Sequence, residues 1–204
     1  MELRDAVRRR HMVRAFAARR VAPALVDDLI DLARRAPSAG NTRPWAFVVL
    51  EGDDTARLWD VTLAAGRRAS FRWPGLLTAP VVVVPLVEPG AYPRRYAEGD
   101  KAGTGLGSGE DAWAVPYWWV DGGMAVQTLL LAATDAGLGA LFYGLFEHEA
   151  AALAALGVPA GWRALGAVAL GWPAEDPGPP GRSAGRPAPD RDAVVHRGGW
   201  RQRT

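Results

Sequence analysis

A long run from Tyr117 to Ala136 constrains the fold of this chain more than any other segment, because it has helical spacing and is apolar nearly all round. One face of this predicted helix carries Val120, Met124, Gln127, Leu130, Leu131 and Thr134, while Ala125, Leu129 and Ala132 fill others. Gly137 follows directly and suits the left-handed position that ends many helices. A helix without a broad polar side belongs at the centre of a core or in a subunit interface. We therefore expect the rest of the chain to pack around it.

Shorter segments on both sides of this helix predict a mixture of helices and strands. We expect helices over residues 3–10, 23–37, 54–66 and 147–156, and strands over residues 45–50, 81–84, 139–143 and 163–170. Pro80 and Pro85 bound the second strand, since proline cannot donate a hydrogen bond within a sheet. With 204 residues and 49% hydrophobic content, the chain is long enough for one well-buried core, so a single domain over residues 1–204 is expected.

Two segments show no sustained period. Residues 88–115 mix glycines with charges and are predicted to form a long loop, of the kind that often lines a pocket. The charged and aromatic residues of this loop could grip a charged substrate or merely solvate the loop: Arg94, Arg95, Tyr96, Asp100 and Lys101. The tail over residues 172–204 is rich in Pro and Gly as far as Pro189. It is too poor in core residues to fold alone, so we expect it to lie extended across another surface, which a partner subunit could supply.

Composition excludes several kinds of chemistry. The chain has no cysteine, which removes disulfides, thiolate nucleophiles and iron–sulfur clusters, and its three histidines lie far apart, which argues against a metal site. No Gly-x-Ser-x-Gly elbow, Walker loop or GxGxxG after a strand is present. An enzyme of this composition would borrow its reactivity from an organic cofactor. The N-terminus lacks the apolar run of a signal peptide and no apolar segment is long enough to span a membrane, so a cytoplasmic location is expected.

Arginines crowd the first twenty positions although the formal net charge is only +2. Arg10 and Arg14 lie four residues apart where the first predicted helix gives way to extended chain. Fixed guanidinium groups of this kind suit a phosphate monoester, and each such hydrogen bond contributes roughly 1.5–3 kcal/mol. The alternative is a solvated basic helix face. Nucleic acid is not expected as a partner, because only Phe16 accompanies the run as a base-stacking aromatic.

Four segments together resemble the FMN-dependent nitroreductase family. They are Arg10-x-x-x-Arg14-x-Phe16, Ala36-Pro37-Ser38-Ala39-x-Asn41-x-x-Pro44-Trp45, Asp121-Gly122-Gly123-Met124-Ala125-Val126-Gln127 and Ala169-Leu170-Gly171-Trp172-Pro173. The resemblance covers most of the chain except residues 52–115. It implies an α+β sandwich whose mixed, mainly antiparallel sheet is flanked by helices. It also implies an intertwined homodimer in which the C-terminal tail embraces the partner and FMN lies in a cleft built by both subunits.

The resemblance also implies roles for the residues that match. Arg10 would bind the FMN phosphate, His11 and Met12 would contact the ribityl chain or phosphate, and Arg14 would face the pyrimidine edge of the flavin. Pro37, Ser38, Ala39 and Asn41 would reach the same flavin from the neighbouring subunit. Tyr143, Gly144 and Leu145 match the segment whose backbone approaches flavin N5. Arg186 would complete the phosphate site, with Arg182 as its competitor, and Trp113 and Tyr117 would line the substrate pocket.

The activity implied by the resemblance is a ping-pong reaction. NAD(P)H passes hydride to the flavin and leaves, and a nitroaromatic, quinone or similar flat acceptor then takes its place in the cleft. No side chain is assigned an acid–base role, since the flavin is the reactive centre. Two alternatives stay open at this point: a flavin-dependent dehydrogenase of the same fold in a biosynthetic pathway, and a flavin-binding sensor protein without turnover. Met12 and Arg43 stand where the family often has Ser and Gln.

Overall fold

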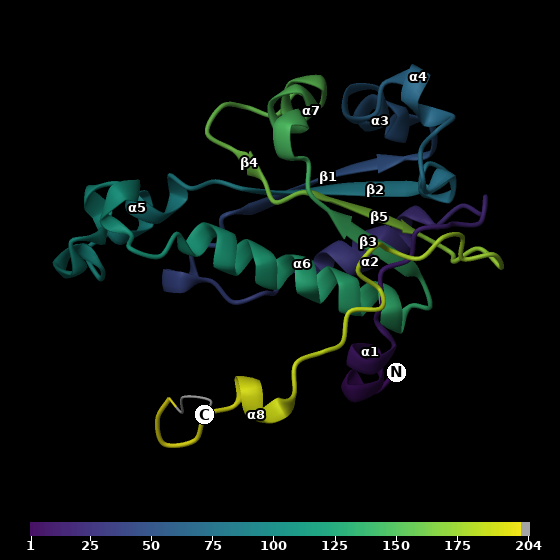
Figure 1. Cartoon of the computed structure of the whole chain (residues 1–204). Helices are drawn as coiled ribbons and strands as arrows, with labels where there is room; N and C mark the ends of the chain where they lie inside the picture. Colours follow the sequence, from purple (N-terminus) through teal and green to yellow (C-terminus); the bar gives the residue numbers. More distant parts are fainter. Residues whose placement is uncertain (201–204) are drawn as a thin grey trace.

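A central antiparallel sheet organises the computed structural model, which describes residues 1–200 (Figure 1). Its strands are β1 (Trp45–Glu51), β2 (Val81–Val87), β5 (Ala167–Gly171) and β3 (Gly139–Tyr143), which lie side by side in the order β1-β2-β5-β3. A short strand, β4 (Arg163–Ala164), pairs with the end of β2. Every pair of these strands is antiparallel. The α+β class and the mainly antiparallel sheet are therefore confirmed.

Helices cover both faces of the sheet (Figure 1). On one face lie α6 (Tyr117–Asp135) and α2 (Pro23–Ala33), and on the other lie α3 (Ala56–Thr62), α4 (Ala65–Arg68) and α7 (Glu149–Ala155). Strand β2 is wholly buried, with Val81 and Val83 in one hydrophobic cluster and Val82 and Val84 in the other. This alternation follows from the two-residue period of a strand. The four-valine segment therefore contributes to the hydrophobic clusters on both faces of the sheet.

The long central helix forms as predicted. Helix α6 packs against α2 and the sheet, and Gly137 after its end has a φ of 76°, the left-handed conformation expected there. The N-terminal helix α1 (Leu3–Arg9) also matches its prediction. The predicted helix over 54–66 is instead divided into a 3₁₀ turn (Gly52–Thr55), α3 and α4. Helix α3 stops after Val61 and Thr62, two β-branched residues that favour the helix weakly.

The boundary predicted at Pro85 is wrong, because Pro85 lies inside β2 and is paired with Phe47. On its other side β2 changes partner at this point: Val81–Val83 pair with β5, whereas Leu86 and Val87 pair with β4. No ladder hydrogen bond to β4 or β5 requires an N–H at position 85. The same change of partner divides the strand predicted over 163–170 into β4 and β5, with Gly166 between them at a φ of 144°.

Residues 88–115 are more ordered than predicted. They form a helix, α5 (Ala91–Tyr96), followed by three 3₁₀ turns (Ala102–Thr104, Leu106–Ser108 and Glu110–Ala112). Tyr92 and Trp113 pack with Trp118 of α6 in a small separate core. We call residues 88–115 the α5 segment. Aromatic contacts across the α5 segment hold it together, and these contacts leave no helical repeat in the sequence. Periodicity therefore did not predict the order of this segment.

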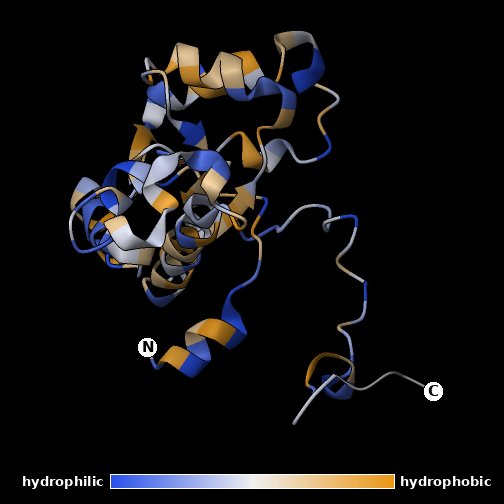
Figure 2. Cartoon of the chain, turned by 90° about the vertical axis from the view of Figure 1, so that its left-hand side faces the viewer, coloured by the Kyte–Doolittle hydropathy of each residue, from blue (hydrophilic) through white to orange (hydrophobic). Residues whose placement is uncertain are grey.

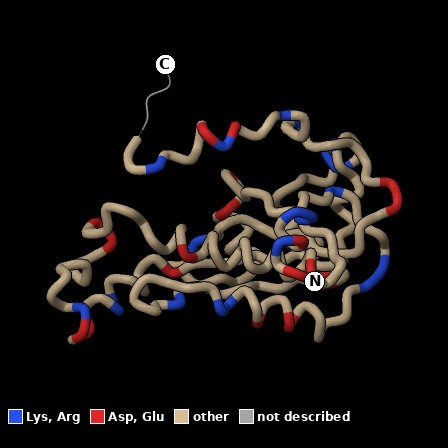
Figure 3. The backbone as a smooth tube through the Cα atoms, turned by 90° about the horizontal axis from the view of Figure 1, so that it is seen from below, with Lys and Arg blue, Asp and Glu red and all other residues tan. Residues whose placement is uncertain are grey.

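The C-terminal end of the chain lies outside the main body. Figures 1 and 2 show the last part of the tail, with α8 (Arg191–Val194), standing away from the sheet and its helices, whereas α1 contacts α6 and the Met1 amino group pairs with Asp135 at the end of that helix. Lys and Arg are interspersed with Asp and Glu over the described residues, without one large basic face (Figure 3). Among the helices of residues 1–200, none is long and apolar enough to cross a membrane.

Candidate cofactor site

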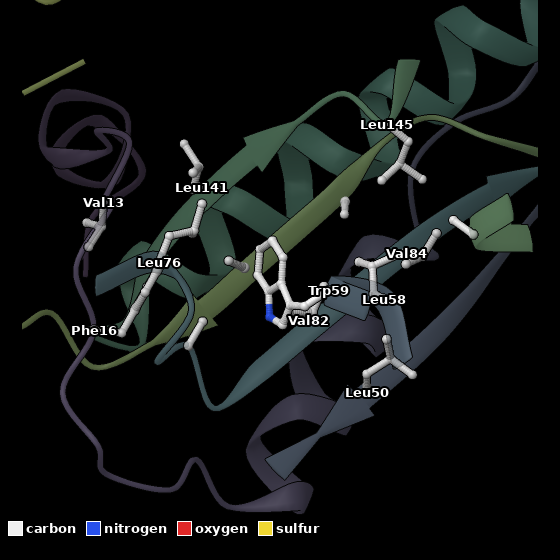
Figure 4. Packing of buried hydrophobic residues seen from close by; sticks show 14 of the residues in the cluster. Val13, Phe16, Leu50, Leu58, Trp59, Leu76, Val82, Val84, Leu141 and Leu145 are labelled. Carbon is white, nitrogen blue, oxygen red and sulfur yellow. The ribbon is translucent and has the colours of Figure 1, made fainter. Parts of the chain in front are cut away.

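The segment after α1 runs along the edge of the sheet beside β3. Met12 forms a parallel bridge with Ala140, and the Val13 N–H donates to the Ala140 carbonyl oxygen at 2.9 Å. Val13 and Phe16 are buried in the cluster that contains Leu141 (Figure 4). These contacts hold the backbone between Arg10 and Arg14 in place, so the two arginines predicted to bind a cofactor stand on a rigid support.

Arg10 carries an unusual nitrogen atom. Its Nη1 is buried, and no hydrogen-bond partner for it is present among residues 1–200. A buried donor left without an acceptor costs about 1–3 kcal/mol, and more when the group is charged. A phosphate oxygen is the kind of acceptor that matches a guanidinium group best. The donor available here therefore fits the phosphate of a nucleotide-like cofactor.

Arg14 is held between an aromatic ring and the tail. Its Nη1 donates to the Met12 carbonyl oxygen at 3.2 Å, and its guanidinium lies 5.7 Å from the centre of the Trp73 ring. Trp73 Nε1 donates to the Pro179 carbonyl oxygen at 3.1 Å. A Cβ on Gly181 would lie 2.8 Å from Arg14 Nη2, so the tail backbone lies close to the guanidinium. The first part of the tail thus covers Arg14 of its own chain.

A cavity of about 440 Å³ opens beside Arg14. Its walls are mainly apolar and aromatic, with Phe71, Trp73, Phe142 and Phe146 among them, and it includes the predicted Tyr143, Gly144 and Leu145. This volume lies in the range of sites for small organic molecules and cofactors. Arg14 and the segment 143–145, far apart in the sequence, are therefore brought to one cavity.

Trp59 and Tyr143 form a stacked pair in the wall of this cavity, with ring centres 5.8 Å apart and planes within 8°. Trp59 Nε1 and the Tyr143 hydroxyl are both buried without a hydrogen-bond partner in the described part of the chain. Burial raises the pKa of the Tyr143 hydroxyl above its usual value. The phenol therefore stays protonated at neutral pH and is a donor rather than a base.

Phe146 stands at the same cavity in a strained conformation. It has a φ of 47° and 82% of its surface is exposed, although it is a large aromatic residue. A Cβ on Gly144 would lie 2.7 Å from the Phe146 ring, so the ring covers the Gly144 backbone. Strain of this kind costs about 1–3 kcal/mol and is concentrated at ligand sites. The sequence analysis missed Phe146 as well as Phe71 and Trp73, which belong to the part of the chain outside the resemblance.

The predicted loop around Ser38 lies elsewhere. Ser38, Ala39 and Asn41 are absent from the residues that line the cavity. Gly40, Asn41 and Arg43 all have left-handed φ values, of 61°, 55° and 52°. Ser38 Oγ accepts from the Arg43 N–H at 2.9 Å, and Asn41 Oδ1 accepts from Arg43 Nε at 2.9 Å. Turn chemistry therefore accounts for part of the loop, and one chain alone does not bring it to the cavity.

The remaining predicted residues are placed as follows. His11 is exposed, with Nδ1 2.9 Å from the Arg9 carbonyl oxygen, and Arg182 and Arg186 are exposed in the tail. Trp113 is only 8% exposed, and its Nε1 donates to the Leu106 carbonyl oxygen at 3.0 Å, whereas Tyr117 is 40% exposed at the rim of the same aromatic cluster. Their roles toward a ligand stay predictions.

An antiparallel sheet covered by helices, with an aromatic cavity and two fixed arginines, defines an α+β protein suited to a planar, phosphorylated cofactor. The model of the nitroreductase family matches residues 7–172, and the chain belongs to this family of oxidoreductases. The chain is 32% identical to the 5,6-dimethylbenzimidazole synthase of Rhodospirillum rubrum, over 82% of this chain and 80% of that protein. It is 30% identical to an NADH dehydrogenase of Thermus thermophilus, over 86% and 89%.

A solved structure supports the fold. The crystal structure of a Desulfovibrio desulfuricans protein described as a nitroreductase, in complex with FMN, matches with a TM-score of 0.69 at 24% identity, over 96% of both chains. The match extends through nearly the whole chain, including much of the α5 segment and tail that the sequence motifs did not cover.

Proposed function

We propose that this protein is an FMN-dependent oxidoreductase that uses NAD(P)H to reduce nitroaromatic, quinone or similar flat acceptors. The observation that carries the proposal is a cavity of about 440 Å³ that Arg14, aromatic side chains and the 143–145 segment line. The buried Nη1 of Arg10, which has no hydrogen-bond partner among residues 1–200, adds a donor suited to a phosphate. Membership of the nitroreductase family and the FMN in the Desulfovibrio desulfuricans relative support it.

In this proposal Arg10 holds the cofactor phosphate, with His11 and Met12 beside it and Arg186 or Arg182 completing the site. Arg14 faces the pyrimidine edge, and Tyr143, Gly144 and Leu145 lie along the reactive edge. Bound FMN supplies the redox chemistry, in which hydride is received from NAD(P)H and given to an acceptor. A guanidinium at the position of Arg14 favours the negative charge that reduction creates. Its contact with Met12 and Trp73 keeps it in place without further reorganisation.

The aromatic walls suit a planar ligand. Phe71, Phe142 and Phe146 line the cavity and offer flat surfaces against which a planar acceptor can stack. The Tyr143 hydroxyl, protonated and buried, can donate a hydrogen bond but does not act as a base at neutral pH. Orientation and electrostatics are therefore what the chain contributes, and no side chain is needed as a general acid or base.

We also propose that the active form is a homodimer with the site shared between subunits. The α6 helix exposes Tyr117 and Val120, and α1 exposes Leu3 and Val7, which are apolar surfaces of the kind buried in subunit interfaces. The loop of Ser38, Ala39 and Asn41 does not line the cavity of its own chain. In a dimer it would complete the cavity of the partner, and the exposed tail would lie across the partner.

The relative from Rhodospirillum rubrum favours a second candidate, an oxidative reaction in a biosynthetic pathway. The two functions differ in what happens to the flavin and its substrate. An NAD(P)H-dependent reductase returns FMN unchanged after each turnover. A flavin-consuming synthase would instead convert FMN itself into a new organic product. Mass spectrometry of the small molecules after incubation with FMN and NADPH in air separates them.

Binding of FMN is the first test. Titration of the purified protein with FMN, followed by flavin fluorescence, is expected to show saturable binding at one site per chain. Riboflavin, which lacks the phosphate, is expected to bind at least about tenfold more weakly, because it leaves Arg10 without its acceptor. Equal affinity for the two flavins would remove the role proposed for Arg10. Absence of binding by either would contradict the proposed function.

A further inference from the structure

The left-handed loop around Asn41 is held from outside by a buried carboxylate. Asp121, near the start of α6, is 1% exposed. Its Oδ2 accepts from the Ala39 backbone N–H at 2.8 Å and also from the Tyr92 hydroxyl of α5. A buried carboxylate is stable only where donors replace the water it has lost. One oxygen atom of Asp121 therefore ties the loop, the central helix and the α5 segment together.

A second attachment comes from Arg95. Its Nε donates to the Gly40 carbonyl oxygen at 2.9 Å. Its two terminal nitrogens form a bidentate pair with Asp100, at 2.7 and 2.8 Å, and Glu98 accepts a further hydrogen bond at 3.1 Å. The pair with Arg95 also lowers the pKa of the Asp100 carboxyl. Arg95 is thus aimed at the loop by partners within the α5 segment.

A third contact with the loop is the packing of an aromatic ring. A Cβ on Gly40 would lie 2.7 Å from the Tyr96 ring, so the ring lies directly against the Gly40 backbone. Gly40 is also left-handed, and any larger residue would meet both the ring and the backbone strain. The loop residues Ala39 and Gly40 are therefore held by one hydrogen bond each and by one ring.

The charges of the α5 segment are engaged in contacts within the chain. Arg94 pairs with Glu88 at 2.7 Å, and Arg95 pairs with Asp100 and Glu98. Lys101 lies over the Tyr96 ring at 5.9 Å. The charges of the α5 segment are thus engaged with one another and with the loop, and contact with a charged substrate stays a prediction.

We infer that Asp121, Tyr92 and Arg95 act as positioning residues that hold the 38–43 loop in the conformation that binds FMN. The inference rests on the proposed function, since the loop contacts the cofactor only if the protein binds one. Left-handed conformations at Asn41 and Arg43 persist only where surrounding contacts impose them. We call the contacts of Asp121, Tyr92 and Arg95 with the loop the clamp. Without the clamp the loop would lose its FMN-binding conformation, and the free energy needed to order it again would lower the affinity for FMN.

The test compares FMN affinity in four proteins. Asp121→Asn removes the negative charge of the side chain that accepts from Ala39 and Tyr92, and Tyr92→Phe removes only the hydroxyl donor while the ring remains. Arg94→Lys is the matched control, because Arg94 is exposed on the same helix and its ion pair is with Glu88. We expect FMN affinity to fall about tenfold in Asp121→Asn and about threefold in Tyr92→Phe, with no change in Arg94→Lys.

A double-mutant cycle separates positioning from general destabilisation. If Asp121 acts through the loop, Asp121→Asn and Asn41→Ala together weaken FMN binding little more than Asn41→Ala alone. Additive losses would overturn the inference, as would unchanged affinity in both Asp121→Asn and Tyr92→Phe. Tyr92→Phe keeps the test open should Asp121→Asn fail to fold.

Hydrogen exchange tests the clamp without the cofactor. Amides of residues 38–43 are expected to exchange faster in Tyr92→Phe than in the wild type or in Arg94→Lys, with the rest of the chain unchanged. Equal exchange in all three proteins would overturn the clamp. Failure of the wild type to bind any flavin would instead overturn the proposed function, and with it the role of the clamp in binding FMN, whatever the exchange shows.

Discussion

Gly122 of α6 lies against Val87 of β2 so closely that a Cβ on the glycine would stand 2.6 Å from Val87 Cγ1. The same Cβ would lie 2.9 Å from Leu165 Cδ1. The absence of a side chain at position 122 therefore sets how near the central helix approaches the sheet. The neighbouring Gly123 is exposed and has nothing within 4 Å of its own Cβ position.

This pair of glycines gives a matched prediction. Gly122→Ala is expected to lower the free energy of unfolding by about 1–3 kcal/mol, because the added methyl group overpacks the contact with Val87. Gly123→Ala adds the same methyl group to the exposed face, where alanine favours the helix by up to about 1 kcal/mol. Urea unfolding of both variants measures the difference. Equal destabilisation of the two would mean that the partner subunit, rather than β2, is what crowds this helix.

Glu149 and Arg163 lead to a prediction about pH. Hydrogen bonds from Arg163, at 2.9 and 3.0 Å, and from the Ala164 N–H hold the pKa of Glu149 below its ordinary value. A carboxyl with a lowered pKa in the folded state stabilises that state above its unfolded pKa, near 4.5, and loses this contribution as the pH falls further. Glu149→Gln is expected to cost about 1 kcal/mol at pH 7, because Arg163 is half exposed and its pairing is screened.

The cost of Glu149→Gln is expected to shrink as the pH falls below 4.5. Thermal unfolding at pH 7 and at several pH values between 5 and 3 would follow it, provided the wild type stays folded across that range. Glu175→Gln, which changes a carboxyl exposed in the tail, is the control variant. A penalty that stays constant down to the lowest pH would contradict the lowered pKa.

Arg10→Ala tests the phosphate site. FMN affinity is expected to fall roughly tenfold to a hundredfold, the contribution of one or two hydrogen bonds between charged groups, whereas riboflavin affinity should change little. Arg9→Ala is the neighbouring control, because Arg9 is exposed at the end of α1. Fluorescence titration with both flavins measures the effect. An equal loss for FMN and riboflavin would show that Arg10 acts on the fold and not on the phosphate.

Mixed dimers test whether the site is shared. When a subunit with Arg10→Ala pairs with a subunit with Asn41→Ala, a shared site leaves one cavity with both changes and the other with neither. We expect half of the FMN sites in such a heterodimer to recover wild-type affinity. Differently tagged subunits, purified as the mixed form and titrated with FMN, provide the measurement. Should Arg10 and Asn41 serve the same cavity from one chain, every site would carry one change and none would recover.

The sequence predicted those parts of the fold that depend on local repeats. The apolar period of residues 117–136 predicted α6, and the run Val81–Val84 predicted β2, because each segment is buried on more than one side. Pro85 was misjudged, since its place in the strand depends on where β5 ends and β4 begins. That change of partner lies far along the chain and leaves no mark around position 85.

Sequence motifs predicted some residues of the candidate site and missed others. Arg14 and the 143–145 segment match family-like segments of the sequence and line one cavity, whereas the place of Arg10 in the same site stays a prediction. The aromatic walls at Phe71 and Trp73 could not be predicted, because only the folded chain brings them to Arg14. Asp121 stands in one of the family-like segments, but its contact with the Ala39 backbone could not be predicted, because the two residues lie far apart along the chain.

The proposed binding of FMN, and the passage of electrons from NAD(P)H through it, can be measured directly. The measurement is the visible absorbance of the protein with bound FMN, recorded without oxygen as NADPH and then NADH are added. The flavin bands are expected to bleach with at least one of the two donors and to return when a quinone or nitroaromatic acceptor is supplied. Bound flavin that neither donor bleaches would contradict the NAD(P)H-dependent activity.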